Sequence, residues 1–152
     1  MKKFEAGFIG AGNMGGALAT AAAKQVTGER VAVACSSPAH SAAAAERLGC
    51  RAAAPEEILG GSKFVFLGVK PQMIDGVVQS LAAPIAASES IFVSMLAGVQ
   101  LERLERLLGA DKKIIRILPN TPCPTAMSRT AISRCFARSW RPRASSTPFP
   151  RR

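Results

Sequence analysis

The chain has few of the residues that build metal centres and disulfide frameworks. Its 152 residues include one histidine and four cysteines, and no two cysteines form a C-x-x-C pair. This scarcity argues against a zinc site, and we expect the cysteines to be reduced thiols of a cytosolic protein. Long apolar runs are also lacking, so no segment is expected to span a bilayer. The apolar stretch after Lys2 and Lys3 is short and broken by glycines, which argues against a signal peptide and favours a cytoplasmic location.

Acidic residues are absent from residues 123–152, as are leucine and valine. This segment carries seven arginines, whereas the whole chain has a net charge of +10, so the preceding residues are close to neutral. Proline, serine and arginine are scattered through the segment without a helical or strand period, which predicts a disordered basic tail. Because the charge is confined to this tail, nucleic-acid binding is the least favoured of three functions that we consider.

Residues 1–122 are predicted to form one α/β domain. Strand-like apolar runs alternate with helical patterns, and the connections are short. Strands are predicted at residues 3–9, 30–35, 50–53, 63–69, 90–96 and 113–118. Helices are predicted at residues 12–25, 39–48, 55–59, 71–86 and 101–108. The alternation is typical of a doubly wound parallel sheet, or Rossmann-like fold, with strand order 3-2-1-4-5-6 and a ligand crevice at the carboxyl ends of the strands.

A glycine-rich motif follows the first predicted strand. Residues 10–15 read Gly-Ala-Gly-Asn-Met-Gly and precede an alanine-rich helix. Gly10 permits a tight turn, Gly12 lets a pyrophosphate approach the backbone, and Gly15 lets the helix lie near the strand. The start of the helix adds free N–H groups and the positive end of its dipole. This context predicts a dinucleotide site, and a βα turn without a ligand is the alternative.

The end of the second predicted strand indicates which dinucleotide binds. Residues 35–38 read Cys-Ser-Ser-Pro, whereas NAD-binding proteins of this fold carry Asp or Glu there to bind the ribose hydroxyls. Without a carboxylate to repel a 2′-phosphate, and with hydroxyl donors on Ser36 and Ser37, we predict NADP, with NAD as the alternative. His40 and Arg47 are nearby candidates for a positive partner. The Ser-Pro pair is also expected to start the next helix, and both roles can hold at once.

Three further motifs follow predicted strands. They are Gly68-Val69-Lys70-Pro71, Ser94-Met95-Leu96-Ala97-Gly98 and Arg116-Ile117-Leu118-Pro119-Asn120-Thr121-Pro122. All three lie at carboxyl ends, the ligand edge of such a sheet. Together with the glycine motif and the Ser-Ser-Pro turn, they make residues 4–122 resemble the N-terminal domain of pyrroline-5-carboxylate reductase, the enzyme of the last step of proline biosynthesis. Other NADP-linked oxidoreductases share the first glycine motif without this set.

The resemblance implies hydride transfer from NAD(P)H to the imine carbon of 1-pyrroline-5-carboxylate, which gives L-proline. It implies that the pyrophosphate and adenosine ribose lie beside Ile9, Gly10, Ala11, Gly12, Asn13, Met14, Ser36 and Ser37. It implies that the nicotinamide half lies beside Val69, Lys70, Pro71, Met95, Leu96, Ala97, Asn120 and Thr121. Because a protonated imine needs little activation, positioning the hydride donor is expected to be the main task, and no general acid is assigned. Lys70 is expected to orient its loop or meet a cofactor oxygen rather than to act as an acid.

The resemblance ends shortly after Cys123. Family members continue into a helical domain that builds the dimer and most of the substrate pocket, and residues 124–152 do not resemble that domain. We therefore expect a truncated or frameshifted product that binds the cofactor but shows little or no turnover. A non-catalytic NADP-binding module is the alternative function.

Overall fold

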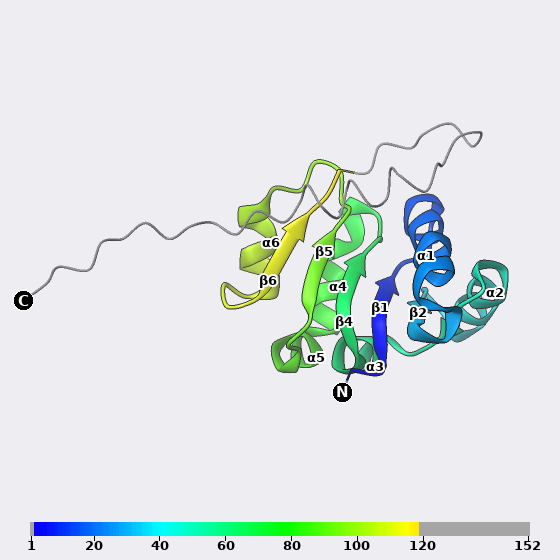
Figure 1. Cartoon of the computed structure of the whole chain (residues 1–152). Helices are drawn as coiled ribbons and strands as arrows, with labels where there is room; N and C mark the ends of the chain where they lie inside the picture. Colours follow the sequence, from blue (N-terminus) through cyan, green and yellow to red (C-terminus); the bar gives the residue numbers. More distant parts are fainter. Residues whose placement is uncertain (1, 119–152) are drawn as a thin grey trace, which may run out of the picture. The chain divides into compact units, whose positions relative to one another are not determined.

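The computed structural model describes residues 2–118, which form an α/β domain around a six-stranded parallel sheet (Figure 1). The strands are β1 (Phe4–Ile9), β2 (Val31–Ala34), β3 (Arg51–Ala52), β4 (Ser62–Leu67), β5 (Ile91–Ser94) and β6 (Lys113–Arg116). Their order, β3-β2-β1-β4-β5-β6, and their parallel pairing confirm the doubly wound sheet that the sequence predicts. The predicted basic tail at 123–152 lies outside the described residues, and the domain boundary at residue 122 stays a prediction.

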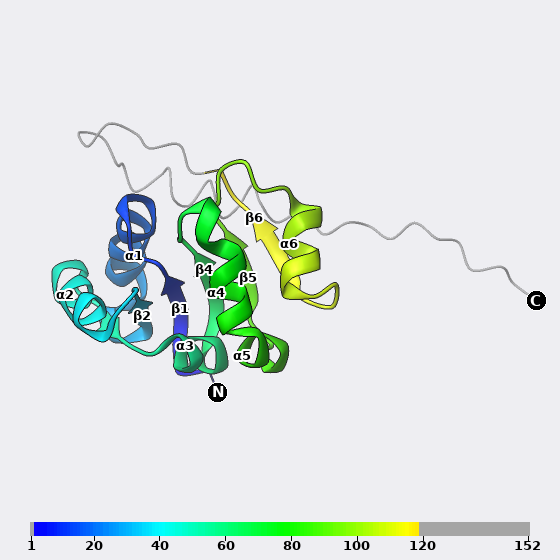
Figure 2. The same cartoon turned by 180° about the vertical axis from the view of Figure 1, so that it is seen from behind.

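Helices cover both faces of the sheet, as two opposite views show (Figure 1, Figure 2). Two helices pack on one face: α1 (Asn13–Val26) and α2 (Pro38–Leu48). Four helices pack on the other: α3 (Pro55–Gly61), α4 (Ile74–Ser80), α5 (Ala82–Ala87) and α6 (Leu101–Leu108). Short 3-10 turns, η1 (Gly28–Arg30) and η2 (Pro71–Met73), complete the described elements. Because alternate residues of a strand face opposite sides, this layering produces two separate apolar clusters.

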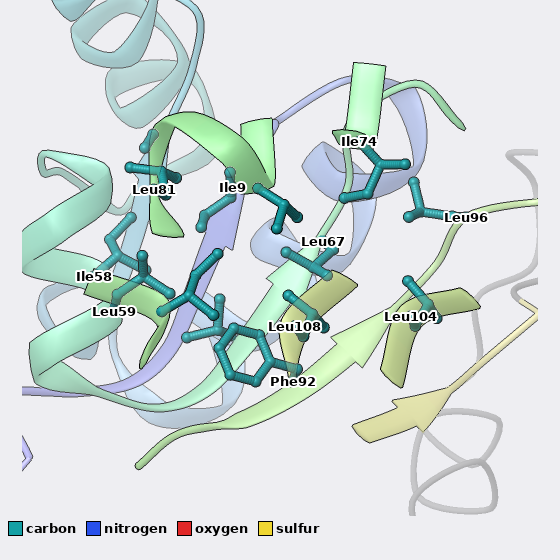
Figure 3. Packing of buried hydrophobic residues seen from close by; sticks show 14 of the residues in the cluster. Ile9, Ile58, Leu59, Leu67, Ile74, Leu81, Phe92, Leu96, Leu104 and Leu108 are labelled. Atoms are coloured by element: carbon teal, nitrogen blue, oxygen red, sulfur yellow. The ribbon is translucent and has the colours of Figure 1, made fainter. Parts of the chain in front are cut away.

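The larger cluster lies between the sheet and helices α3–α6 (Figure 3). Ile9, Leu67 and Phe92 of the central strands pack there with helix residues such as Ile58 and Leu104. All five side chains are at most 5% exposed. Burial of a side chain of this size contributes about 1.5–3 kcal/mol, so this cluster holds the strands in the positions from which the loops at their carboxyl ends emerge.

The smaller cluster lies between the sheet and helices α1 and α2. Phe8 of β1 stacks on Phe66 of β4, with ring centroids 4.6 Å apart and planes 10° from parallel. Ala19 of α1 is fully buried in this cluster, and Leu48 of α2 also packs into it. The small side chains of α1 let this helix lie close to the sheet, next to the turn that precedes it.

One predicted helix is wrong. The sequence pattern predicts a single helix over residues 71–86, but the structure contains η2, α4 and α5 there, with a break at Leu81. Pro84 explains the break, because a proline ring inside a helix clashes with the carbonyl four residues earlier, and this is Ser80, the last residue of α4. The chain then restarts as α5 with Pro84 in the first turn, where its missing N–H removes no helical hydrogen bond. The other predicted elements agree with the structure to within two residues at each end.

Candidate functional site

The loops that follow the central strands meet at one edge of the sheet. The first residue after each of β1, β4 and β5 donates its backbone N–H to the last residue of the neighbouring strand. The bonds are Gly10 to Ala34 (2.8 Å), Gly68 to Ile9 (2.8 Å) and Met95 to Leu67 (3.3 Å). These bonds bring the glycine motif, the end of β2 and the loops after β4 and β5 together, as the sequence predicts for the carboxyl edge.

Three glycines, from the loops after β1 and β4 and from the first turn of α1, allow a close backbone approach. Gly10 has φ +92°, and a Cβ atom there would lie 2.7–2.8 Å from backbone atoms of Gly68 and Val69. A Cβ on Gly15 would lie 2.4 Å from the Gly10 carbonyl oxygen, and one on Gly68 would lie 2.6 Å from the same oxygen. Gly10 and Gly15 therefore have the packing roles predicted for them, and Gly68 shares this role across the sheet.

Gly12 has a different environment from its neighbours in the motif. A Cβ atom built on Gly12 would have no neighbour within 4 Å, so the space in front of this residue is open. Gly12 is the N-cap of α1, and the first turn of that helix contains no acidic residue. The first hydrogen bond of the helix runs from Gly16 N–H to the Gly12 carbonyl (2.7 Å), which leaves the earlier amides without helical acceptors. An anion in this space would meet free N–H groups and the positive end of the helix dipole.

The loop after β2 is held by serine hydroxyls. Ser37 is the N-cap of α2 and accepts the His40 N–H at 3.2 Å, which confirms that the Ser-Pro pair starts a helix. Ser41 accepts the Cys35 N–H at 2.8 Å and so fixes the turn. Ser36 is exposed, and its hydroxyl lies 3.2 Å from Nδ1 of His40.

Arg47 is not near this loop, so its predicted role as a positive partner is wrong. It lies in the last turn of α2, ten residues beyond the N-cap Ser37. At 1.5 Å of rise per residue, about 15 Å of helix separates the two positions. His40, in the first turn of the same helix, is the candidate partner that the fold keeps beside the serines.

The loops after β4 and β5 form the other half of this edge. Met95 and Leu96 are buried, and the Leu96 N–H donates to the hydroxyl of fully buried Ser94 at 3.3 Å. The Met95 methyl lies 3.0 Å from where a Cβ on Gly68 would be, so the two loops touch. Val69 and Pro71 are half-buried, whereas Lys70 and Ala97 are exposed. The structure thus brings these predicted residues to the same edge as the glycine motif, while Asn120 and Thr121 lie outside the described residues.

Gly68 and Ser94 have structural roles at this edge that the sequence pattern alone does not assign. Both stand in the quoted motifs, but neither was predicted as a site residue. A glycine directly at the end of an apolar strand often marks a close backbone approach, so the position of Gly68 could have indicated its packing role. Its partners, Gly10 and Gly15, are far away in sequence, so the contact becomes visible only with the order of the strands.

Cys35 follows β2 and Cys50 precedes β3, and both are free thiols. Burial raises the pKa of the Cys50 thiol above its ordinary value, and the neighbouring Cys35 raises it further. Cys50 is therefore protonated at neutral pH and is a poor nucleophile. Within residues 2–118, no three His, Cys, Asp or Glu side chains gather as metal ligands would, and no helix there has the length and apolarity needed to cross a membrane.

Comparisons with known proteins agree with this arrangement. The chain is 36% identical over 130 residues to pyrroline-5-carboxylate reductase of Escherichia coli, covering 84% of this chain and 48% of that protein. It is 35% identical over 119 residues to pyrroline-5-carboxylate reductase 3 of Macaca fascicularis, covering 77% of this chain and 43% of that protein. A solved pyrroline-5-carboxylate reductase from Coxiella burnetii superposes with a TM-score of 0.69 at 25% identity, covering 79% of this chain and 45% of that one.

The chain spans about half the length of the curated relatives it matches, and these matches confirm the resemblance drawn from the sequence motifs. A family model described as NADP oxidoreductase coenzyme F420-dependent matches residues 5–98, which include the glycine turn, the serine loop and the loops after β4 and β5. The chain therefore belongs to this family of NADP oxidoreductases.

Proposed function

We propose that the chain takes part in the NAD(P)H-dependent reduction of 1-pyrroline-5-carboxylate to L-proline. The observation that carries the proposal is the glycine turn at the carboxyl edge of the sheet, where Gly10 and Gly15 are in close backbone contact and the space in front of Gly12 is open. The names of the similar proteins from Escherichia coli and Macaca fascicularis supply the substrate and the reaction.

The residues at this edge fit a dinucleotide. Residues 11–14 present backbone N–H groups and the open face of Gly12 to the pyrophosphate, which needs close approach to a backbone without side chains. Ser36 and Ser37 offer hydroxyls to the adenosine ribose. Val69–Pro71 and Met95–Ala97 lie on the other side of the glycine motif, where the nicotinamide half is expected. Asn120 and Thr121 are proposed to line the same half on grounds of sequence.

In the proposed reaction, the bound cofactor supplies a hydride to the imine carbon, and the protonated imine nitrogen becomes the secondary amine of proline. The chain contributes orientation rather than acid–base chemistry. Met95 and Leu96 are buried in the two apolar clusters and so anchor the loop after β5 beside the nicotinamide side. Ser94 fixes the backbone of this loop through its bond to the Leu96 N–H. Lys70 is exposed on the neighbouring loop, where its ammonium can meet a cofactor oxygen or orient its loop.

We further propose that NADP is preferred over NAD and that the protein is cytoplasmic. The loop after β2 has no carboxylate at residues 35–37, so a 2′-phosphate meets no negative side chain within this loop. The cytoplasmic location is supported by the two described cysteines, which are both free thiols.

Two measurements test the proposal. Titration with NADPH, followed by nucleotide fluorescence, tests the cofactor site, and NADPH oxidation with formation of proline tests the reaction. Gly60→Ala is a matched control, because Gly60 lies near the end of α3, just before β4 begins, with open space around it. Binding that is equal in the parent chain and this control supports the site, and absence of binding contradicts it. Binding without turnover favours the alternative, a non-catalytic nucleotide-binding module.

A further inference from the structure

We infer that His40, held by Ser36, selects the 2′-phosphate of NADP over the free ribose hydroxyl of NAD. This inference rests on the proposed function, because it assigns a specificity-determining residue within the same dinucleotide site. It concerns a side chain in the first turn of α2, next to the loop in which the absence of a carboxylate already favours NADP.

The backbone puts this loop beside the pyrophosphate turn. Gly10 N–H donates to the Ala34 carbonyl at 2.8 Å, so the glycine motif and the end of β2 leave the sheet as direct neighbours. The turn that follows is fixed, because the Cys35 N–H donates to the Ser41 hydroxyl at 2.8 Å. A nucleotide that lies across Gly12 therefore reaches residues 36–40 with its adenosine end, in the order usual for this fold.

The serines of this loop have different tasks. Ser41 is buried, and its hydroxyl both accepts the Cys35 N–H and donates to the Ser37 carbonyl at 2.9 Å. Ser37 is half-buried and accepts the His40 N–H as the helix cap. Ser36 alone of the three is exposed, and its hydroxyl bonds only the His40 ring among residues 2–118. The Ser36–His40 pair is therefore the part of the loop that is free to meet a ligand.

The charges around this pair favour an anion. The first turn of α2 contains no acidic residue, and its N-terminal end carries the positive end of the helix dipole. Contact between Ser36 and Nδ1 orients the imidazole and leaves Nε2 on an exposed side chain. Nε2–H can donate to a phosphate oxygen, and the negative charge of that acceptor strengthens the bond. Arg47 lies seven residues beyond His40, about 10 Å further along the helix, and is not part of this loop.

Dissociation constants of NADPH and NADH, measured on the full chain and its variants, test the inference. His40→Gln keeps a polar side chain but removes the imidazole N–H, and we expect NADPH to bind about tenfold more weakly, as for loss of one hydrogen bond to a charged phosphate. NADH, which lacks the phosphate, is expected to bind within about twofold of its original affinity. His40→Arg is expected to restore NADPH binding, and Arg47→Gln is the matched control that changes neither affinity.

The outcomes separate this inference from the proposed function. If the parent chain binds neither nucleotide, the dinucleotide site itself is wrong and both proposals fall. If both nucleotides bind but His40→Gln leaves their affinity ratio unchanged, or weakens both equally, only the assignment to His40 is overturned. Melting temperatures of the variants show whether a common loss of affinity comes from a damaged α2.

Discussion

Gly10 and Gly12 stand two residues apart, yet alanine is expected to affect folding stability at only one of them. Alanine at Gly12 should weaken nucleotide binding and leave folding almost unchanged. An added Cβ has no neighbour within 4 Å, and Gly12 has φ −68°, which alanine adopts without strain. Alanine is a poorer helix N-cap than glycine, which lowers the stability by about 0.5–1 kcal/mol. It also reduces the conformational entropy of the unfolded chain, which raises the stability by about as much. We therefore expect the free energy of unfolding to change by less than about 0.5 kcal/mol.

The same methyl group fills the space through which the pyrophosphate is proposed to approach the backbone. Loss of one hydrogen bond between a backbone N–H and a charged phosphate costs about 1.5–3 kcal/mol, which corresponds to a roughly 10- to 100-fold increase in the dissociation constant of NADPH. Fluorescence titration measures the affinity, and urea denaturation measures the stability of the same preparation.

Gly10→Ala supplies the contrast. Here φ is +92°, and the added Cβ would lie 2.7–2.8 Å from the backbone of Gly68 and Val69, which cannot rotate away. The unfavourable φ costs about 1 kcal/mol and the collisions add to it, so stability and binding are expected to fall together. The reasoning is refuted if Gly12→Ala unfolds the protein as much as Gly10→Ala does, or if Gly12→Ala binds NADPH as tightly as the parent chain.

Three further changes test the structure away from the site. Lys112→Met should lower the free energy of unfolding by roughly 1–3 kcal/mol in urea, because the ammonium donates to the carbonyls of Ala86 (2.7 Å) and Ser88 (3.1 Å), and an unchanged midpoint would contradict these bonds. Thr27→Gly should raise stability by about 1 kcal/mol, visible as a higher melting temperature, because Thr27 has φ +74°; a lower melting temperature would argue against that conformation. Cys50 has a raised pKa, so its contribution to stability is complete below the ordinary thiol pKa of 9.0 and is lost as the pH rises through the folded value. Cys50→Ala should therefore flatten the alkaline fall in denaturation midpoint, and an unaltered fall would assign it to other groups.

Much of this fold can be predicted from local sequence patterns, because each pattern has a local cause. Apolar runs bounded by glycine mark the strands, and a Ser-Pro pair marks the start of α2, where Ser37 caps the helix. The helix predicted over 71–86 fails for an equally local reason, since Pro84 breaks it at Leu81. Greater weight on proline than on apolar periodicity would have found this break.

The candidate site is predictable only in part, because its parts come together through the order of the strands. The glycine motif can be recognised from the sequence, because its residues are close together in the chain. The contact of Gly68 with Gly10 depends on β4 lying beside β1, which the local pattern does not state. Arg47 is a similar case. It is ten residues from Ser37 in sequence, and because those residues form α2, about 15 Å of helix separates the two positions.

The central position of β1 has a consequence for the order in which the protein can be made. β1 is the first strand to be synthesised, but one of its two neighbours is β4, paired from Phe4 with Ser62 to Ile9 with Leu67. Until β4 has left the ribosome, the edge of β1 that pairs with β4 is unpaired, and the contact between Gly10 and Gly68 cannot form. Such non-local pairing is slow to form. A ligand of the glycine turn can therefore stabilise only nascent chains that have already paired these two strands, and it would favour completed domains over partial ones.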